Sequence, residues 1–144
     1  MAVPSELCWA IRESFLEYVE ALPDATISCS AGAQRAEHGF TFPAAEIPET
    51  ESSLRFVGEV RVSAHAGALN VVLRDPHIVV DDGGAWLEIT TDTGRMRPAR
   101  LLDAPSLPVS ERASFADVAL TLDGASWLGG VYNPWTRVAP IVIR

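Results

Sequence analysis

The chain has 144 residues, of which 48% are hydrophobic and 21% charged, and its formal net charge is −8. This length fits one domain, residues 1–144, with a core of its own, and the negative charge argues against nucleic acid and against an anionic membrane surface as the main partner. Because no run of about 18 apolar residues occurs and the N-terminus lacks an apolar signal core, we expect no membrane-spanning segment, no secretory signal and a cytoplasmic location.

The first expected element is an amphipathic helix around residues 9–18, WAIRESFLEY. Its apolar positions follow a helical spacing: Leu7, Ile11, Phe15 and Leu22. Ser5 is a candidate N-cap, and Pro23 ends the run because a residue before proline leaves the helical region. Ser14 and Tyr18 are one turn apart, so their hydroxyls project from the same side. We expect the helix to cover a sheet, with this pair at the edge of a pocket.

The rest of the chain predicts short antiparallel strands. They are expected at residues 26–30, 37–42, 54–64, 69–74, 77–80, 85–91, 95–102, 115–122 and 137–143. Asp75-Pro76 and Asp123-Gly124 are expected turns, Gly58 indicates a bulge or a close backbone approach, and Pro140 predicts an edge position for the last strand. This spacing is typical of a sandwich or barrel. The expected fold class is therefore mainly β, an antiparallel β-sandwich or barrel-like domain with one N-terminal amphipathic helix.

Common enzyme and metal-site motifs are missing from the sequence. It has no G-x-S-x-G, P-loop, G-x-G-x-x-G, H-E-x-x-H or C-x-x-C pattern. Cys8 and Cys29 have no metal or redox spacing, and we expect buried or half-buried free thiols; a disulfide between them is the alternative, which a reducing compartment disfavours. His38 and His77 are interpreted as turn or surface residues.

Three residues stand out only in combination. Tyr18 and Tyr132 are the two tyrosines of the chain, and His65 lies in a corner of small residues that would let a flat ligand approach. A phenol that ligates ferric iron must lose its proton, and a nearby imidazole that donates a hydrogen bond stabilises the phenolate. Each residue taken alone is more often structural, since a helix tyrosine usually packs at the core margin.

Five segments, in order along almost the whole chain, resemble the HtaA domain family of heme-binding modules. They are W-x-x-x-x-S-F-x-x-Y at 9–18, G-F-T-F-P at 39–43, F-V-G-E-V at 56–60 with H-A-G-A-L at 65–69, D-P-H-I-V-V at 75–80 and G-G-V-Y at 129–132. The resemblance implies a β-rich fold with a short helical part and one heme. Family members are heme-uptake proteins, usually secreted or anchored at the surface, in contrast to the cytoplasmic location expected above.

The resemblance also implies roles for five residues. Tyr18 would be the axial ligand of a ferric b-type heme, and His65 would hydrogen-bond the tyrosine oxygen. Ser14 would line the propionate side, and Tyr132 would pack on or near the porphyrin. Val131 stands where the family has an aromatic residue, which predicts the loss of one stacking contact. Phenolate ligation favours Fe(III), which suits capture and transfer better than oxygen binding.

The leading hypothesis is a heme-binding protein that acts in heme transfer, storage or uptake, with a carrier favoured over an enzyme. One alternative is a small intracellular heme-dependent enzyme with an open iron face. Another is a related pocket that has lost heme and binds or transforms another apolar small molecule, or a plain β-rich interaction domain. Other heme-transfer proteins are candidate partners, and a homodimer is a candidate oligomeric state.

Overall fold

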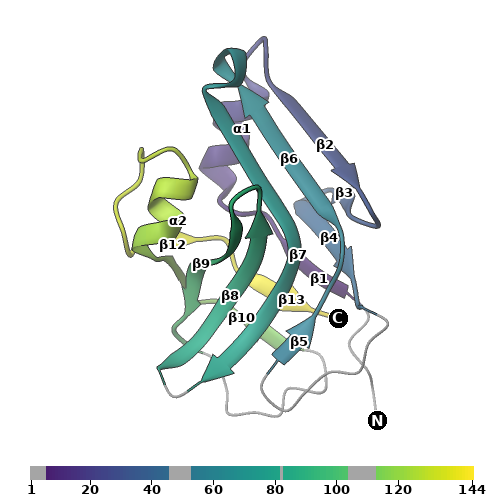
Figure 1. Cartoon of the computed structure of the whole chain (residues 1–144), viewed down its shortest axis with the longest axis vertical. Helices are drawn as coiled ribbons and strands as arrows, with labels where there is room; N and C mark the ends of the chain where they lie inside the picture. Colours follow the sequence, from purple (N-terminus) through teal and green to yellow (C-terminus); the bar gives the residue numbers. More distant parts are fainter. Residues whose placement is uncertain (1–5, 46–52, 82, 104–112) are drawn as a thin grey trace.

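Two antiparallel sheets and two short α-helices make up residues 6–45, 53–81, 83–103 and 113–144, which the computed structural model describes (Figure 1). In chain order the elements are β1 (Glu6–Trp9), α1 (Glu13–Glu20), β2 (Thr26–Ser30), β3 (Gln34–Ala36), β4 (Gly39–Pro43), β5 (Ser53–Arg55), β6 (Glu59–Ala64), the 3₁₀ helix η1 (His65–Gly67), β7 (Leu69–Asp81), β8 (Gly84–Thr91), β9 (Gly94–Leu101), β10 (Ala113–Phe115), β11 (Val118–Leu120), α2 (Leu122–Trp127), β12 (Arg137–Val138) and β13 (Ile141–Ile143).

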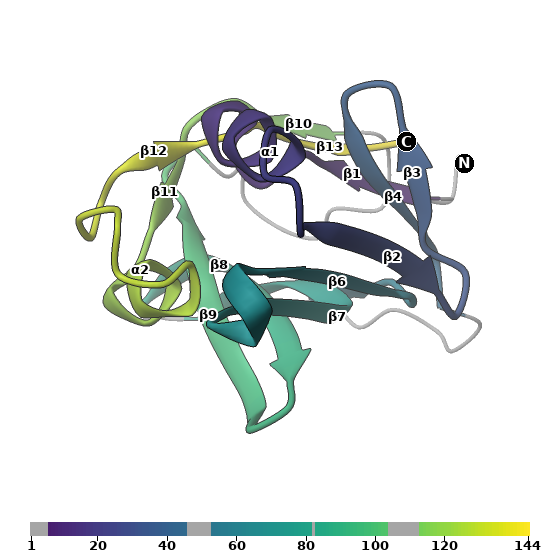
Figure 2. The same cartoon turned by 90° about the horizontal axis from the view of Figure 1, so that it is seen from above.

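The two sheets face each other and together form a half-barrel (Figure 2). The smaller has the strand order β10-β13-β1-β4-β3, and the larger has the order β12-β11-β9-β8-β7-β6-β2, with β5 paired to β7. All five phenylalanines of the sequence are buried in the core between them. The mainly β class with antiparallel sheets is thus confirmed. Among the described residues, no helix is long and apolar enough to cross a membrane.

The expected start of the N-terminal helix is wrong. Residues Glu6–Trp9 form β1, which pairs with β4 and β13, so that Leu7 and Trp9 are buried between half-buried neighbours. The chain turns at Ile11, with φ 63°, and α1 begins only at Glu13 after the extended residue Arg12. The alternation of Leu7 and Trp9 fits a strand, and it overrides the helical spacing of Leu7 and Ile11. The end of the helix before Pro23 is as expected.

The expected turn at Asp75-Pro76 is wrong as well. Strand β7 runs through it, and the register with β8 shifts between Arg74 and His77, which marks a bulge. Asp75, with φ 49°, exchanges hydrogen bonds with Gly58: its N–H donates to the Gly58 oxygen at 2.9 Å, and its Oδ1 accepts from the Gly58 N–H at 3.1 Å. A Cβ on Gly58 would lie 2.7 Å from the nitrogen of Ala33, so the expected close approach is confirmed.

Two further differences concern the C-terminal part. The expected turn at Asp123-Gly124 is the first turn of α2, which Thr121 caps by accepting the Gly124 N–H at 3.0 Å. The expected strand 137–143 is divided at Pro140 into β12 and β13, which join different sheets, and β13 lies between β10 and β1 rather than at an edge. Cys8 and Cys29 are half-buried free thiols, as expected. The segments between the expected strands 37–42 and 54–64, and between 95–102 and 115–122, lie mainly outside the described residues.

Candidate functional site

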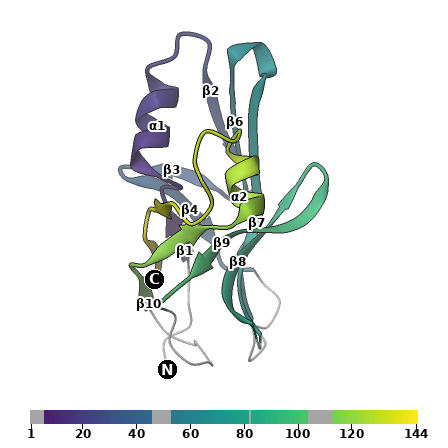
Figure 3. The ribbon, with the colours of Figure 1, turned by 90° about the vertical axis from the view of Figure 1, so that its left-hand side faces the viewer.

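A pocket of about 560 Å³ opens between α1, η1 and the segment that follows α2. Figure 3 shows that segment rising between the two α-helices. The pocket is lined by Phe15, Tyr18, His65, Ala68, Leu69, Leu128, Gly129, Val131 and Tyr132. Its volume lies within the range of small-molecule sites, and apolar walls with a few convergent polar groups are typical of such sites.

Helix α1 supplies one wall of the pocket. Phe15 is buried and Tyr18 is 51% exposed, and the two side chains are three residues apart on neighbouring parts of the helix surface. Phe15 therefore forms part of the apolar floor, while Tyr18 stands at the rim. The wall is fixed because Phe15, Leu16 and Val19 pack into the core between the sheets.

Tyr18 and His65 form a hydrogen-bonded polar pair in the pocket. The Tyr18 Oη lies 2.6 Å from the His65 Nε2, and the centroids of the two rings are 6.0 Å apart. This distance is a short hydrogen bond between residues that are 47 positions apart. An imidazole protonated at Nε2 can donate to the phenol oxygen, so the pair can stabilise a phenolate at the mouth of an apolar pocket.

His65 reaches Tyr18 from a turn in unfavourable backbone conformation. His65 and Ala66 have φ of 53° and 55°, and Gly67 continues with φ of 91°. A left-handed conformation costs a residue with a side chain roughly 1 kcal/mol. Asp24, in the loop after α1, holds this turn because its Oδ2 accepts the Ala66 N–H at 2.9 Å. The same hydrogen bond holds the pKa of the Asp24 carboxyl below its usual range.

The opposite wall is the irregular corner that follows α2, at residues 129–132. Gly129 and Gly130 have φ of 89° and 76°, which favours glycine, and the Gly130 N–H donates to the Ala125 oxygen at 2.9 Å to end the helix. The corner carries Val131, which is 76% exposed, and Tyr132, which packs against the core. Val131 therefore reaches the pocket at its exposed rim.

Four of the five predicted site residues thus line one pocket: Tyr18, His65, Val131 and Tyr132. Ser14 does not. It lies on α1 one turn before Tyr18, in a neighbouring groove, and its hydroxyl accepts a hydrogen bond from Arg12. Sequence reasoning had assigned no role in the pocket to Leu69, Leu128 or Phe15. Of these three, only Phe15 could have been predicted from the sequence, because it lies three residues before Tyr18 on the same helix.

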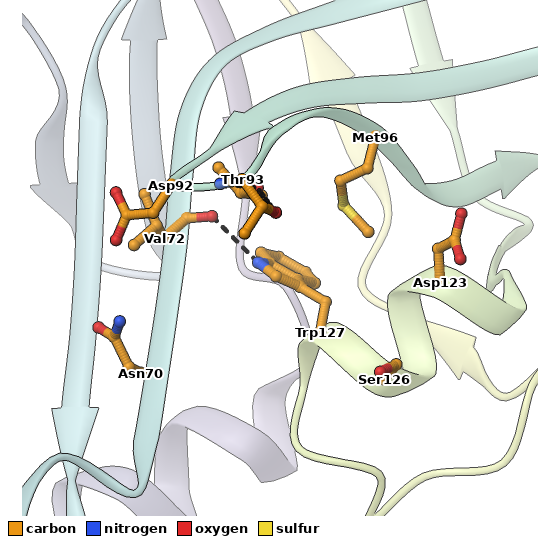
Figure 4. A pocket seen from close by; sticks show the side chains of 9 residues that line it. Asn70, Val72, Asp92, Thr93, Met96, Asp123, Ser126 and Trp127 are labelled. Carbon is orange, nitrogen blue, oxygen red and sulfur yellow. Dashed lines mark hydrogen bonds between the residues drawn. The ribbon is translucent and has the colours of Figure 1, made fainter.

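A second hollow, of about 500 Å³, lies between α2 and the β8–β9 turn (Figure 4). Its walls are more polar and include Asn70, Asp92 and Asp123. The Trp127 indole lines it and donates its N–H to the Val72 oxygen at 3.0 Å. No group of three or more histidine, cysteine or acidic side chains that could hold a metal ion occurs among the described residues. Of these two pockets, the one lined by Tyr18, here called the Tyr18 pocket, combines apolar walls with a hydrogen-bonded polar pair.

Comparison with known proteins gives a family and a fold. The profile of the HtaA family, described as Htaa, matches residues 5–144. The C-terminal domain of HtaA from Corynebacterium glutamicum is 19% identical, with 98% of this chain and 94% of that chain covered and a TM-score of 0.76. The heme-binding protein HtaB from the same organism is 19% identical, with coverages of 97% and 91% and a TM-score of 0.77. No curated protein sequence matches.

Proposed function

The chain belongs to the HtaA family, whose profile covers residues 5–144, and we propose that it is a heme-binding protein in which Tyr18 is the axial ligand of a ferric b-type heme. The observation that carries this proposal is the 2.6 Å contact between the Tyr18 Oη and the His65 Nε2 in an apolar pocket. The fold is shared with HtaB, which is a heme-binding protein.

The residues of the pocket fit a porphyrin. Phe15, Leu69 and Leu128 offer apolar walls to a flat apolar ring, and the exposed rim at Val131 leaves room for its edge. Tyrosine is one of the side chains that hold heme iron in proteins. The pocket therefore provides both the surface and the oxygen donor that such a ligand requires.

His65 stabilises the ligand form of Tyr18. A hydrogen bond to a charged group favours the charged form, and it is stronger than a hydrogen bond between neutral partners. With a proton on Nε2, His65 donates to the Tyr18 oxygen and favours the phenolate. The strained turn at η1 and its anchor on Asp24 hold the imidazole in position for this bond.

Capture and delivery of heme suit this site. An anionic oxygen ligand stabilises Fe(III) relative to Fe(II), so Tyr18 disfavours reductive turnover. The ligand stands at an exposed rim, 51% accessible, where another protein can reach the bound molecule. We therefore assign the protein to heme transfer, storage or uptake, with other heme-transfer proteins as partners.

A hemin titration of the apo protein, followed by visible absorption, tests the proposal. We expect a saturable one-to-one change with a tyrosinate-to-iron charge-transfer band, which Tyr18→Phe abolishes and His65→Ala weakens. Tyr132→Phe is the matched control, because it removes the other phenol hydroxyl and keeps the band. An unchanged spectrum and affinity in Tyr18→Phe would refute the ligand assignment.

Two other outcomes separate the alternatives. Peroxide turnover far above that of free hemin would favour a heme enzyme instead of a carrier. Wild-type protein without any specific hemin signal would mean that the pocket holds another apolar molecule.

A further inference from the structure

A cation without a carboxylate partner stands beside the pocket. The Arg12 Nε donates to the Arg137 oxygen at 3.2 Å, and its Nη1 donates to the Ser14 Oγ. Its guanidinium carbon lies 4.8 Å from the centroid of the Tyr132 ring, which is a wall of the pocket. Within the described part of the chain, Arg12 forms no ion pair, and the remaining N–H groups of its guanidinium have no protein acceptor.

The neighbouring arginine differs in this respect. Arg137 lies next to Arg12 through its backbone oxygen, but its Nε is 2.6 Å from the Asp117 Oδ1. The charge of Arg137 is therefore already compensated. Arg12 keeps its charge available in a chain whose formal net charge is −8, where an anionic ligand is otherwise repelled.

We propose that Arg12 determines ligand specificity by binding a free carboxylate of the porphyrin held in the Tyr18 pocket, an inference that rests on the proposed function. Heme carries two propionates, and an apolar pocket cannot hold these charges. An arginine beside the pocket supplies directed donors for a carboxylate. The Ser14 hydroxyl accepts from Arg12, so its own proton stays free to donate to the same carboxylate.

The geometry also limits where the carboxylates lie. Arg12 lies against the Tyr132 ring, whereas His65 and η1 bound the pocket on the side of Tyr18. Glu13 lines the same groove as Arg12, so it is an acid that a carboxylate bound by Arg12 would have nearby. We therefore expect a bound porphyrin to have its carboxylate end on the Arg12 side of Tyr132 and its apolar edge toward Leu69 and Leu128.

The test compares two ligands in two proteins. Wild type and Arg12→Met are titrated with ferric hemin and with its dimethyl ester, in which both carboxylates are capped. Methionine keeps a long apolar side chain against Tyr132 and removes the charge. We expect the affinity for hemin to fall about tenfold in Arg12→Met, the affinity for the diester to be the same in both proteins, and Arg12→Lys to recover part of the loss.

Arg35→Met is the matched control. Arg35 also lies over an aromatic ring, with its guanidinium carbon 5.0 Å from the centroid of Phe40, but it pairs with Glu20 and does not line the pocket. The same substitution there leaves the affinities for both ligands unchanged.

The other outcomes overturn the proposal in distinguishable ways. An equal loss of affinity for hemin and for the diester in Arg12→Met would assign Arg12 to packing alone. If Arg12→Met bound hemin as tightly as wild type, Arg12 would have no part in binding the ligand. If wild type bound neither ligand, the proposed heme-binding function would be refuted, and the proposed contact between Arg12 and a carboxylate would be refuted with it.

Discussion

Replacing Gly124 with alanine should raise the helix propensity of α2 but disrupt its packing against β9. A Cβ at this position in α2 would lie 1.9 Å from the carbonyl oxygen and 2.7 Å from the carbonyl carbon of Pro98. Non-bonded heavy atoms attract best at about 3.5–4.0 Å. The obstructing atoms belong to the backbone of β9, in the larger sheet, so no flexible side chain can give way. Helix α2 must move away from β9 by on the order of 1 Å.

The magnitude follows from the contacts that such a movement breaks. Alanine in place of glycine in a helix stabilises it by about 1 kcal/mol. Against this stand overpacking, at about 1–3 kcal/mol, and the weakening of two or three hydrogen bonds, at about 1 kcal/mol each. These include the bond from Thr121 Oγ1 to the Arg97 oxygen at 2.6 Å and from the Trp127 indole to the Val72 oxygen at 3.0 Å. We expect a net loss of about 2–5 kcal/mol in the free energy of unfolding.

Thermal and urea unfolding, followed by circular dichroism, measure this loss. The expected fall in Tm is roughly 7–17 °C. Gly83→Ala is the control, because a Cβ there would meet its nearest atom, the Asp81 Oδ1, at 3.4 Å, and its effect should stay within about 0.5 kcal/mol. Hemin affinity should fall together with stability in Gly124→Ala, since α2 leads directly into the wall at Leu128. A variant as stable as wild type would refute the claim that backbone packing fixes α2.

Two further predictions concern titratable groups. Asp24→Ala removes the acceptor of the Ala66 N–H and should weaken hemin binding in a spectral titration. Asp24→Asn keeps an acceptor oxygen and should retain most of the hemin affinity. Equal hemin affinity of wild type and Asp24→Ala would contradict this prediction. Burial, with the charges of Arg95 and Arg55, lowers the pKa of His77 from 6.5 to about 4. Between these two pH values the imidazole is protonated in the unfolded chain but not in the folded one. The free energy of unfolding should therefore fall as the pH drops from 6.5 to about 4. His77→Gln should make this decline in stability with pH smaller. A titration midpoint of His77 near pH 6.5 in NMR spectra of the folded protein would contradict the lowered pKa.

The fold class was predictable because turn residues and alternation repeat along the chain, but two elements depend on tertiary contacts. In the segment 6–11 the apolar residues satisfy both a helix and a strand period, and only pairing with β4 and β13 decides for the strand. In α2 the pair Asp123-Gly124 is a turn signal, yet a helix of six residues forms there because Thr121 caps it and Gly124 lets it approach β9. Short helices draw their stability from packing rather than from propensity.

The candidate site divides in the same way. Tyr18, His65 and Tyr132 carry recognisable chemistry, so the sequence could point to them before any contact was known. In the sequence, Arg12 and Arg137 are no more than guesses for a propionate contact, since a surface role is the default for both, and Asp24 has no indicated role. Their contacts join residues that are far apart in the chain: Asp24 meets Ala66 across 42 positions and Arg12 meets Arg137 across 125. Only the folded arrangement of loops gives these two residues a role.

The placement of His65 shows why the sequence alone could not supply the site geometry. Local preference would keep His65 and Ala66 out of the left-handed region, so the turn exists because other contacts outweigh its cost. Those contacts are the Asp24 carboxylate on one side and the Tyr18 hydroxyl on the other. Since both partners lie in or just after α1, the helix positions the tyrosine and also holds the histidine that faces it. Any movement of α1 therefore shifts Tyr18 and its hydrogen-bond partner His65 together. In the proposed function, such a movement would couple heme release to contact with a partner protein.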